Sequence, residues 1–162
     1  MKDVSRRCAD LERLLHNEVP LSRTIGMKVH GYDGDRLELR ALLEPNINIY
    51  GVAFGGSIYS MCALSGWGLL IMGLQEKGLN PRIMIAGGEI EYAKPVKQTI
   101  NAVSSFPGGQ KFSTFVDTCR DKRSARIKVP VQVELEDGTV AAHFVGSYIA
   151  FDRGGRPVRN GD

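Results

Sequence analysis

The chain has 162 residues, of which 43% are hydrophobic and 24% charged, and its formal net charge is +3. These values are typical of one globular domain that can bury its own core. Because acidic and basic residues are interspersed, the charge does not require a nucleic-acid partner. The cysteines, Cys8, Cys62 and Cys119, are odd in number and far apart. That pattern argues against a disulfide framework or a zinc site and favours a reducing, cytoplasmic compartment.

The chain before residue 45 predicts one helix and a strand hairpin. Apolar residues at helical spacing predict a helix over residues 3–17, ended by Pro20. Its charged start lacks an apolar leader, so we expect no secretory signal. Strands are expected over residues 25–31 and 36–43, joined by the Asp33-Gly34 turn, because an Asp-Gly pair adopts the positive φ angles of a two-residue hairpin turn.

The central stretch from Pro45 to Lys77 is the most distinctive part of the sequence. No charged residue occurs between Glu44 and Glu76. A polar loop with a glycine leads into an apolar segment that predicts a helix buried on every side. The segment is long enough to cross a bilayer. Its glycines and serines and the lack of a basic flanking cluster nevertheless lead us to expect no membrane span.

The remaining chain predicts a second, larger group of strands. Strands are expected over residues 82–92, 99–106, 126–135 and 140–151, with a short helix over residues 111–123. Gly87-Gly88 inside the first of them indicates a bulge or a close approach by other atoms. Residues 153–162 are rich in Gly and Arg and are expected to be frayed. The economical arrangement is an α+β fold, with one antiparallel sheet curled around the central helix in a single domain.

The residues around the central helix carry a family resemblance. Pro45 to Ser57 reads P-N-I-N-I-Y-G-V-A-F-G-G-S, Gly66-Trp67-Gly68 follows within the helix, and Tyr92 and Pro95 end the next strand. This pattern resembles the hotdog-fold acyl thioesterases, and most closely the YiiD C-terminal type of thioesterase domain, from about Leu11 to Phe151.

The resemblance implies a hotdog fold, hydrolysis of acyl-CoA or acyl carrier protein thioesters, no cofactor and no metal. It also implies a homodimer or a dimer of dimers, with sites shared between subunits. Two departures from the better-understood hotdog thioesterases concern catalysis. Phe54 stands where they carry His, and Ala63-Leu64-Ser65 stands where many carry a catalytic Asp or Glu. A general base must therefore come from outside the central helix.

Four residues are candidates for catalysis: Asn48, Gly56, Ser57 and Glu89. The N–H groups at a helix start can hold an oxyanion, which gives Gly56 its role. Asn48 would position the attacking water, and Glu89 would be the base if it is buried at a subunit junction. Each has a structural alternative: a tight loop for Gly56, an Asx turn for Asn48, a helix start for Ser57 and a solvated strand face for Glu89.

The candidates for substrate binding are Asn46, Phe54, Gly55, Met61, Trp67 and Lys94. The acyl chain would lie beside Ile58, Met61 or Trp67, and Lys94 with Lys97 would meet the phosphates of CoA. Asn46 also fits a turn role. Two other functions stay open at this point: a non-catalytic acyl-CoA-binding module and a structural dimer domain.

Overall fold

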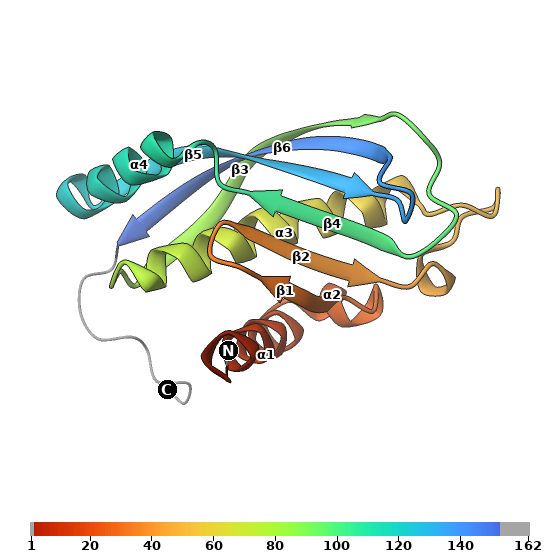
Figure 1. Ribbon diagram of the computed structural model, residues 1–162, viewed down its shortest axis with the longest axis horizontal. Helices are drawn as coiled ribbons and strands as arrows, with labels where there is room; N and C mark the ends of the chain where they lie inside the picture. The colour runs from red at the N-terminus through yellow and green to blue at the C-terminus, as the bar shows by residue number, and fades with distance from the viewer. Residues whose placement is uncertain (1, 153–162) are drawn as a thin grey trace.

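The computed structural model describes residues 2–152. In chain order the elements are α1 (Lys2–Glu18), α2 (Pro20–Thr24), β1 (Lys28–Tyr32), β2 (Arg36–Ala41), a 3-10 helix (Glu44–Asn46), α3 (Gly55–Glu76), β3 (Pro81–Tyr92), β4 (Ile100–Ser105), α4 (Gly109–Lys122), β5 (Ser124–Glu134) and β6 (Val140–Asp152). One antiparallel sheet with the strand order β1-β2-β4-β5-β6-β3 curls over α3 (Figure 1). The expected α+β arrangement of a sheet around a long central helix is confirmed.

The sheet has an inner face, which packs on α3, and an outer face on the opposite side. Alternation along the strands assigns residues to these faces. Leu37 and Leu39 of β2 and Val129 and Val131 of β5 are buried on the inner face, as their spacing predicts. Polar residues such as Arg126 and Lys128 alternate with them and are exposed on the outer face. The core therefore lies between one face of the sheet and α3.

Glycines in α3 allow the helix to approach its neighbours closely. A Cβ on Gly68 would lie 2.7 Å from the side chain of Leu37 and 3.2 Å from that of Leu11 in α1. A Cβ on Gly66 would collide with the ring of Tyr148 in β6. The Gly-x-Gly pair thus serves packing against the sheet and α1. By length and composition α3 could cross a membrane. However, 67% of its most apolar 18-residue stretch is buried inside this fold, as in the core helix of a globular domain.

A small polar cluster lies inside the core where α3 meets β4. Ser65 and Ser104 are both fully buried. Their hydroxyls are 2.9 Å apart, and the Ser104 hydroxyl also donates to the Ser65 carbonyl at 3.0 Å. Ser65 is the polar residue of the stretch Ala63-Leu64-Ser65, and its hydroxyl is part of the core rather than of an open site.

Two expectations about the first third of the chain need correction. Pro20 ends the first helix but also begins a second one, because its missing N–H and fixed φ suit the first helical turn. The first strand begins at Lys28, not at residue 25, since Ile25 ends α2 and donates its N–H to the Leu21 carbonyl at 3.0 Å. Residues 153–162, expected to be frayed, lie outside the described residues.

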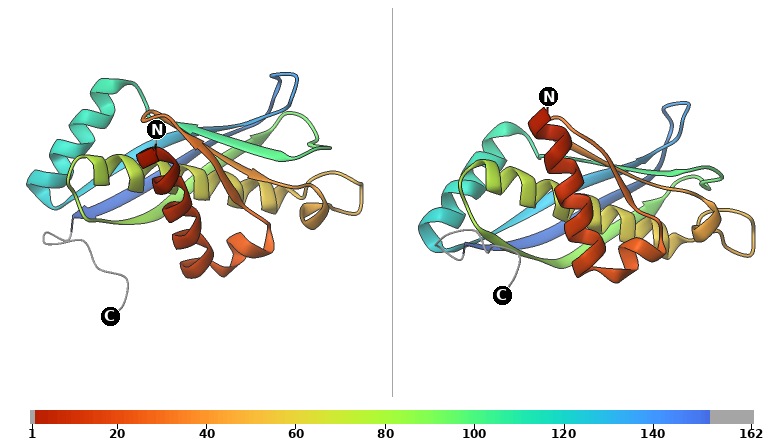
Figure 2. Two further views of the ribbon diagram at one scale, coloured as in Figure 1. Left: turned by 60° about the horizontal axis from the view of Figure 1, so that its bottom comes forward. Right: turned by 90° about the horizontal axis from the view of Figure 1, so that it is seen from below.

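The amphipathic helix α1 covers the edge of the sheet at β1 (Figure 2). Glu12 of α1 accepts the backbone N–H of Val29 at 2.9 Å, and its other carboxylate oxygen lies 3.0 Å from Nζ of Lys28. An exposed strand edge can pair with other chains. This contact occupies one edge N–H group of β1 and ties α1 to it.

Candidate active site

The N-terminus of α3 presents backbone donors without partners. Phe54, at the N-cap, is extended with φ −63° and ψ 131°, and no side chain caps the helix. Within residues 2–152, no acceptor is bound to the N–H groups of Gly55, Gly56 or Ser57. The first intrahelical bond is from Ile58 N–H to the Phe54 carbonyl at 3.1 Å. Three donors and the positive end of the helix dipole therefore meet at this point.

A cavity of about 510 Å³ opens in front of this helix end. It is lined by Pro45, Asn46, Ile47, Asn48, Ile49, Tyr50, Phe54 and Ser57. Ile47, Ile49, Tyr50 and Phe54 are all more than half exposed, which is unusual for such large apolar residues clustered in one short segment. The cavity joins an apolar wall to the hydroxyl of Ser57, which has no hydrogen-bond partner among the described residues. Its volume is in the range of small-molecule sites.

The two asparagines of the loop differ in what their side chains do. Asn48 Oδ1 accepts the N–H of Tyr50 at 2.9 Å and that of Val52 at 3.3 Å, which is an Asx-type turn. Asn46 is buried, and its Nδ2 donates to the carbonyls of Ile25 and Leu42 at 2.9 and 2.8 Å. Asn46 Oδ1 is the buried side-chain atom within residues 2–152 that lacks a partner. The free acceptor therefore belongs to Asn46, and the turn belongs to Asn48.

Neighbouring rings occupy the space beside the two glycines. A Cβ on Gly56 would lie 2.9 Å from Cζ of Phe54 and closer still to Cε1 of that ring. A Cβ on Gly55 would lie 3.3 Å from the hydroxyl of Tyr92, which donates to the Gly55 carbonyl at 2.8 Å. The absent side chains thus make room for Phe54 and Tyr92, and Ser57 is the helix-start residue that lines the cavity.

Comparison with known proteins assigns this fold and loop to a family. Residues 8–152 match the family described as "Putative thioesterase (yiiD_Cterm)". The chain belongs to this thioesterase family. The expected resemblance is confirmed, and the match includes the loop, the helix start and all six strands of the sheet.

Solved structures of similar proteins agree with this assignment. A protein of unknown function from Chlorobaculum tepidum TLS shares 28% identity with a TM-score of 0.84, over 90% of this chain and 94% of that one. A "putative thioesterase from Shewanella oneidensis" shares 26% identity with a TM-score of 0.82, over 91% of this chain and 99% of that one. A thioesterase from Haemophilus influenzae, 12% identical with a TM-score of 0.70 over 92% and 93% of the two chains, shows the fold alone.

In this member of the thioesterase family, the expected acyl-contacting residues of α3 lie in the core. Ile58 and Met61 are 3% and 0% exposed, and neither lines the cavity at the helix start. Trp67 is half-buried, and its indole N–H donates to the Ile83 carbonyl of β3 at 3.1 Å. The apolar wall of the cavity is formed instead by Ile47 and Ile49. The sequence signal for this wall was the presence of two isoleucines in a polar loop that also contains Gly51.

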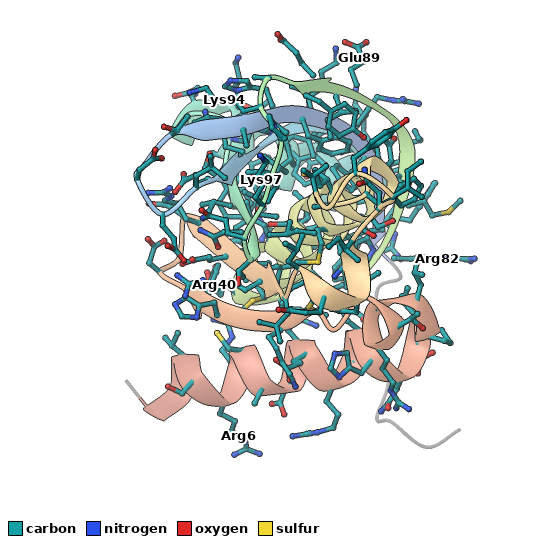
Figure 3. The ribbon with its side chains drawn as sticks, turned by 90° about the vertical axis from the view of Figure 1, so that its right-hand side faces the viewer. Arg6, Arg40, Arg82, Glu89, Lys94 and Lys97 are labelled. Atoms are coloured by element: carbon teal, nitrogen blue, oxygen red, sulfur yellow. The ribbon has the colours of Figure 1, made fainter. Side chains whose placement is uncertain are left out.

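Glu89 does not reach the cavity. It pairs with Val145 of β6 and is exposed on the outer face of the sheet, opposite α3, as Figure 3 shows from the end of the molecule. The space beside Gly88, which the sequence suggested for a ligand, is filled by the Tyr59 hydroxyl and the Phe144 ring, 2.6 and 2.7 Å from a Cβ placed there. The role of Glu89 as a base therefore has no support from its position.

Lys94 and Lys97 lie in the loop after β3, at the same end of the molecule as the start of α3 (Figure 3). The loop is fixed to that helix start, because Ala53 N–H donates to the Val96 carbonyl at 2.8 Å. Both lysines are exposed. Asp137 accepts the Thr139 N–H at 2.8 Å, and its carboxyl pKa is lowered by that bond and, less strongly, by nearby Lys94.

Titratable groups around the cavity are few. Burial raises the pKa of the Cys62 thiol to about 12, so this residue of α3 is a neutral core side chain. Burial also raises the pKa of Tyr92, which keeps its hydroxyl protonated as a donor. No group of three His, Cys, Asp or Glu residues suited to a metal ion occurs within residues 2–152. The cavity is therefore lined by Ser57 with its backbone N–H and hydroxyl, the Tyr50 phenol, the two amides and apolar side chains.

Proposed function

We propose that this protein is an acyl thioesterase that hydrolyses acyl-CoA thioesters in the cavity at the start of α3. The observation that carries the proposal is that Ser57, whose backbone N–H has no acceptor and whose hydroxyl has no partner among the described residues, lines a cavity of about 510 Å³ that also has an apolar wall. A thioester has the matching parts: a carbonyl that becomes an oxyanion and an apolar acyl chain. Membership of a thioesterase family supports the same reaction class.

In the proposed reaction the carbonyl oxygen of the thioester lies at Ser57. The Ser57 N–H and hydroxyl donate to it and stabilise the negative charge that forms when water attacks, as oxyanion donors do. The acyl chain lies along Ile47 and Ile49. The C–S bond then breaks, the thiolate of CoA takes a proton derived from the water, and the carboxylic acid is released.

Asn46 is the residue proposed to hold the attacking water. A buried acceptor without a donor costs about 1–3 kcal/mol, so an opening of the loop that admits a water to Asn46 Oδ1 would remove that cost. The cavity lining contains no carboxylate and no imidazole. The proposed reaction therefore depends on alignment of the water and on stabilisation of the oxyanion, unless another subunit supplies a base.

The proposal includes a homodimer formed along β3. This strand is at the edge of the sheet, and its Met84, Ile85 and Tyr92 are 51%, 42% and 50% exposed. A long edge with apolar side chains is a liability in a monomer. Pairing two copies along β3 would cover it and bring a second chain next to Tyr92, at the start of α3. Sedimentation of a micromolar sample tests this, and a monomeric mass would exclude it.

The cytoplasm is the proposed compartment, because all three cysteines are free thiols and reducing compartments preserve them. CoA is the proposed carrier, because Lys94 and Lys97 lie at the same end of the molecule as the cavity and could meet its phosphates. The assay described below compares acyl carrier protein thioesters directly with acyl-CoA thioesters.

The deciding experiment measures thiol release from a panel of acyl-CoA and acyl carrier protein thioesters of increasing chain length. We expect turnover by the wild type and a loss of about 10²-fold in kcat for Ser57→Ala, the scale of one oxyanion donor. Ser60→Ala is the matched control, since the one hydrogen bond of its hydroxyl among the described residues is donated to the Gly56 carbonyl one turn away. Binding of acyl-CoA without thiol release would instead identify a binding module, and absence of binding a structural domain.

A further inference from the structure

The strand β5 has an open edge over more than half of its length. It pairs with β6 from Ser124 to Glu134, but with β4 only from Val131 to Val133. The reason is that β4 ends at Ser105, where the chain turns away into α4. Residues 124–130 of β5 therefore have one neighbouring strand instead of two. Within residues 2–152, no backbone hydrogen bond from a loop or helix reaches this stretch either.

The register shows which main-chain groups face the open side. Phe106 N–H donates to the Asp35 carbonyl, so the even-numbered residues at the end of β4 face β2 and Val103 faces β5. Val103 is paired with Gln132, whose N–H and C=O therefore face β4. The main-chain groups of every second residue in a strand face the same side. Those of Pro130, Lys128 and Arg126 therefore also face the side of β4, at positions that β4 does not reach. Pro130, which has no N–H, fits this position because a proline does not interrupt a ladder on its open side.

A groove runs beside this edge. It has a volume of about 520 Å³, and α4 forms its other wall with Gln110, Lys111, Thr114, Phe115 and Thr118. α4 and β5 lie next to each other at one end of the molecule in every view (Figures 1 and 2). Phe115 is buried at the base, and Pro130 and Val145 add apolar surface. The groove thus combines apolar side chains with unpaired main-chain donors and acceptors.

The groove is also positively charged. Lys111, Arg126 and Lys128 line it, and no Asp or Glu does. None of the three takes part in an ion pair within residues 2–152, and Arg126 has only the Ser147 hydroxyl, at 3.3 Å from Nη1. The segment that follows Asp152 carries three arginines and one aspartate, so its charge opposes binding here. The complementary occupant is an acidic segment from another protein.

We propose that the groove between α4 and β5 binds an extended acidic segment of a partner protein, which adds a strand to the open edge of β5. The main-chain groups of Arg126 and Lys128 would bond to the segment, as in other cases of strand addition. Its residues opposite Arg126 and Lys128 would be Glu or Asp on the outer face, where cross-strand pairs of opposite charge are favourable. The intervening residues would be apolar and would pack toward Phe115. The groove shares no lining residue with the cavity at α3.

The test uses two capped synthetic peptides, one alternating Glu with Val and one alternating Lys with Val, titrated into isotope-labelled full-length protein. We expect the Glu peptide to bind with a Kd below about 1 mM and to slow hydrogen exchange at the amides of Arg126 and Lys128. The amide of Ile127, which already faces β6, should change little. The Lys peptide should not bind. Binding of neither peptide, or binding without protection of these two amides, would overturn the proposal.

Two sets of variants sharpen the test. Lys128→Pro removes an N–H that faces the open side, so the fold should tolerate it as it tolerates Pro130, while Lys128→Ala removes the charge alone. Binding of the Glu peptide should be about tenfold weaker in Lys128→Pro than in Lys128→Ala, as expected for one lost main-chain bond. The doubly reversed variant Arg126→Glu/Lys128→Glu should bind the Lys peptide instead. Equal affinities in the two Lys128 variants, or self-association through this edge in place of peptide binding, would contradict the proposal.

Discussion

Tyr92 donates a hydrogen bond of 2.8 Å from its hydroxyl to the carbonyl of Gly55, and so joins the last residue of β3 to the first residue of α3. The ring also fills the space that a Cβ on Gly55 would enter. Because Tyr92 is half-exposed at the edge of the sheet, a second chain paired along β3 would contact it directly. The start of the central helix is thus tied to the strand proposed for dimerisation.

Removing this hydroxyl should loosen the helix start without emptying the space beside it. Tyr92→Phe keeps the ring, so we expect a loss of about 1 kcal/mol in the free energy of unfolding, the usual value of one such bond. Denaturant unfolding measures it, with Tyr50→Phe as control, because Tyr50 is 81% exposed. If both variants lose the same stability, the bond to Gly55 does not contribute.

Gly56→Ala should damage the site through Phe54. The added Cβ would lie 2.9 Å from Cζ of that ring, so the ring must move out of the cavity wall. We expect thiol release to fall by about 10-fold, a smaller loss than removal of a donor, because the backbone N–H groups remain. In the background Phe54→Ala the same change should cost little. If the double variant loses as much activity as the two single variants combined, the collision between the added Cβ and the Phe54 ring is not the cause of the loss in Gly56→Ala.

The sequence predicted the fold because the hydrophobic period of each main element, and the residues that end it, can be recognised from its own stretch of sequence. The alternation of Leu37 and Leu39, the charge-free central helix and the Asp-Gly turns all agree with one sheet around one helix, and every strand lies within a few residues of its expected bounds. α2 and the 3-10 helix were missed since each is a short turn set by local hydrogen bonds. Such segments have no periodic pattern to detect.

The sequence left the roles of the site residues open, for two physical reasons. A bulge between Ile85 and Gly87 adds one residue to β3, so strict alternation from Ile83 could not have shown that Glu89 lies on the outer face. The two asparagines are chemically identical in the sequence. Only the folded loop decides that Asn48 Oδ1 accepts backbone N–H groups while Asn46 Oδ1 is left without a partner.

Glu89→Gln should therefore leave catalysis unchanged. The carboxylate is exposed on the face opposite α3, so kcat/KM and its dependence on pH should match the wild type within about twofold. Thiol release measured across pH 5 to 9 checks this. Loss of the acidic limb of the profile in this variant would show that the residue does reach a substrate in the assembled protein.

Asn48 should tolerate the exchange of its amide for a carboxylate. Asn48→Asp keeps the oxygen that accepts the N–H groups of Tyr50 and Val52, so the loop and the thiol-release activity should be preserved. Asn48→Ala removes that acceptor and should lower stability by about 1 kcal/mol and disorder the cavity wall. If Asn48→Asp loses activity while keeping its stability, the amide nitrogen has a chemical role and the turn is only part of its function.

The last prediction concerns Glu12, whose carboxylate joins α1 to the edge strand β1. Burial on its own would raise the pKa of Glu12, but the Val29 N–H and the Lys28 ammonium outweigh it, and the pKa is lowered overall. A carboxyl with a lowered pKa in the folded state stabilises the protein above its unfolded pKa of about 4.3, and that stability is lost as the pH falls through the folded value.

Glu12→Gln should accordingly cost about 1 kcal/mol at pH 7, a value kept small because the group is partly solvated. The difference from the wild type should shrink as the pH falls below about 4.3, because the wild-type carboxylate is then protonated as well. Asp10→Asn is the matched control on the same helix, since within residues 2–152 Asp10 forms ion pairs with the exposed Arg6 and Arg13 alone. Unfolding measured from pH 7 to pH 3 decides the matter. A difference that stays constant over this range would mean that Glu12 acts through its packing, and that its charge does not hold α1 on β1.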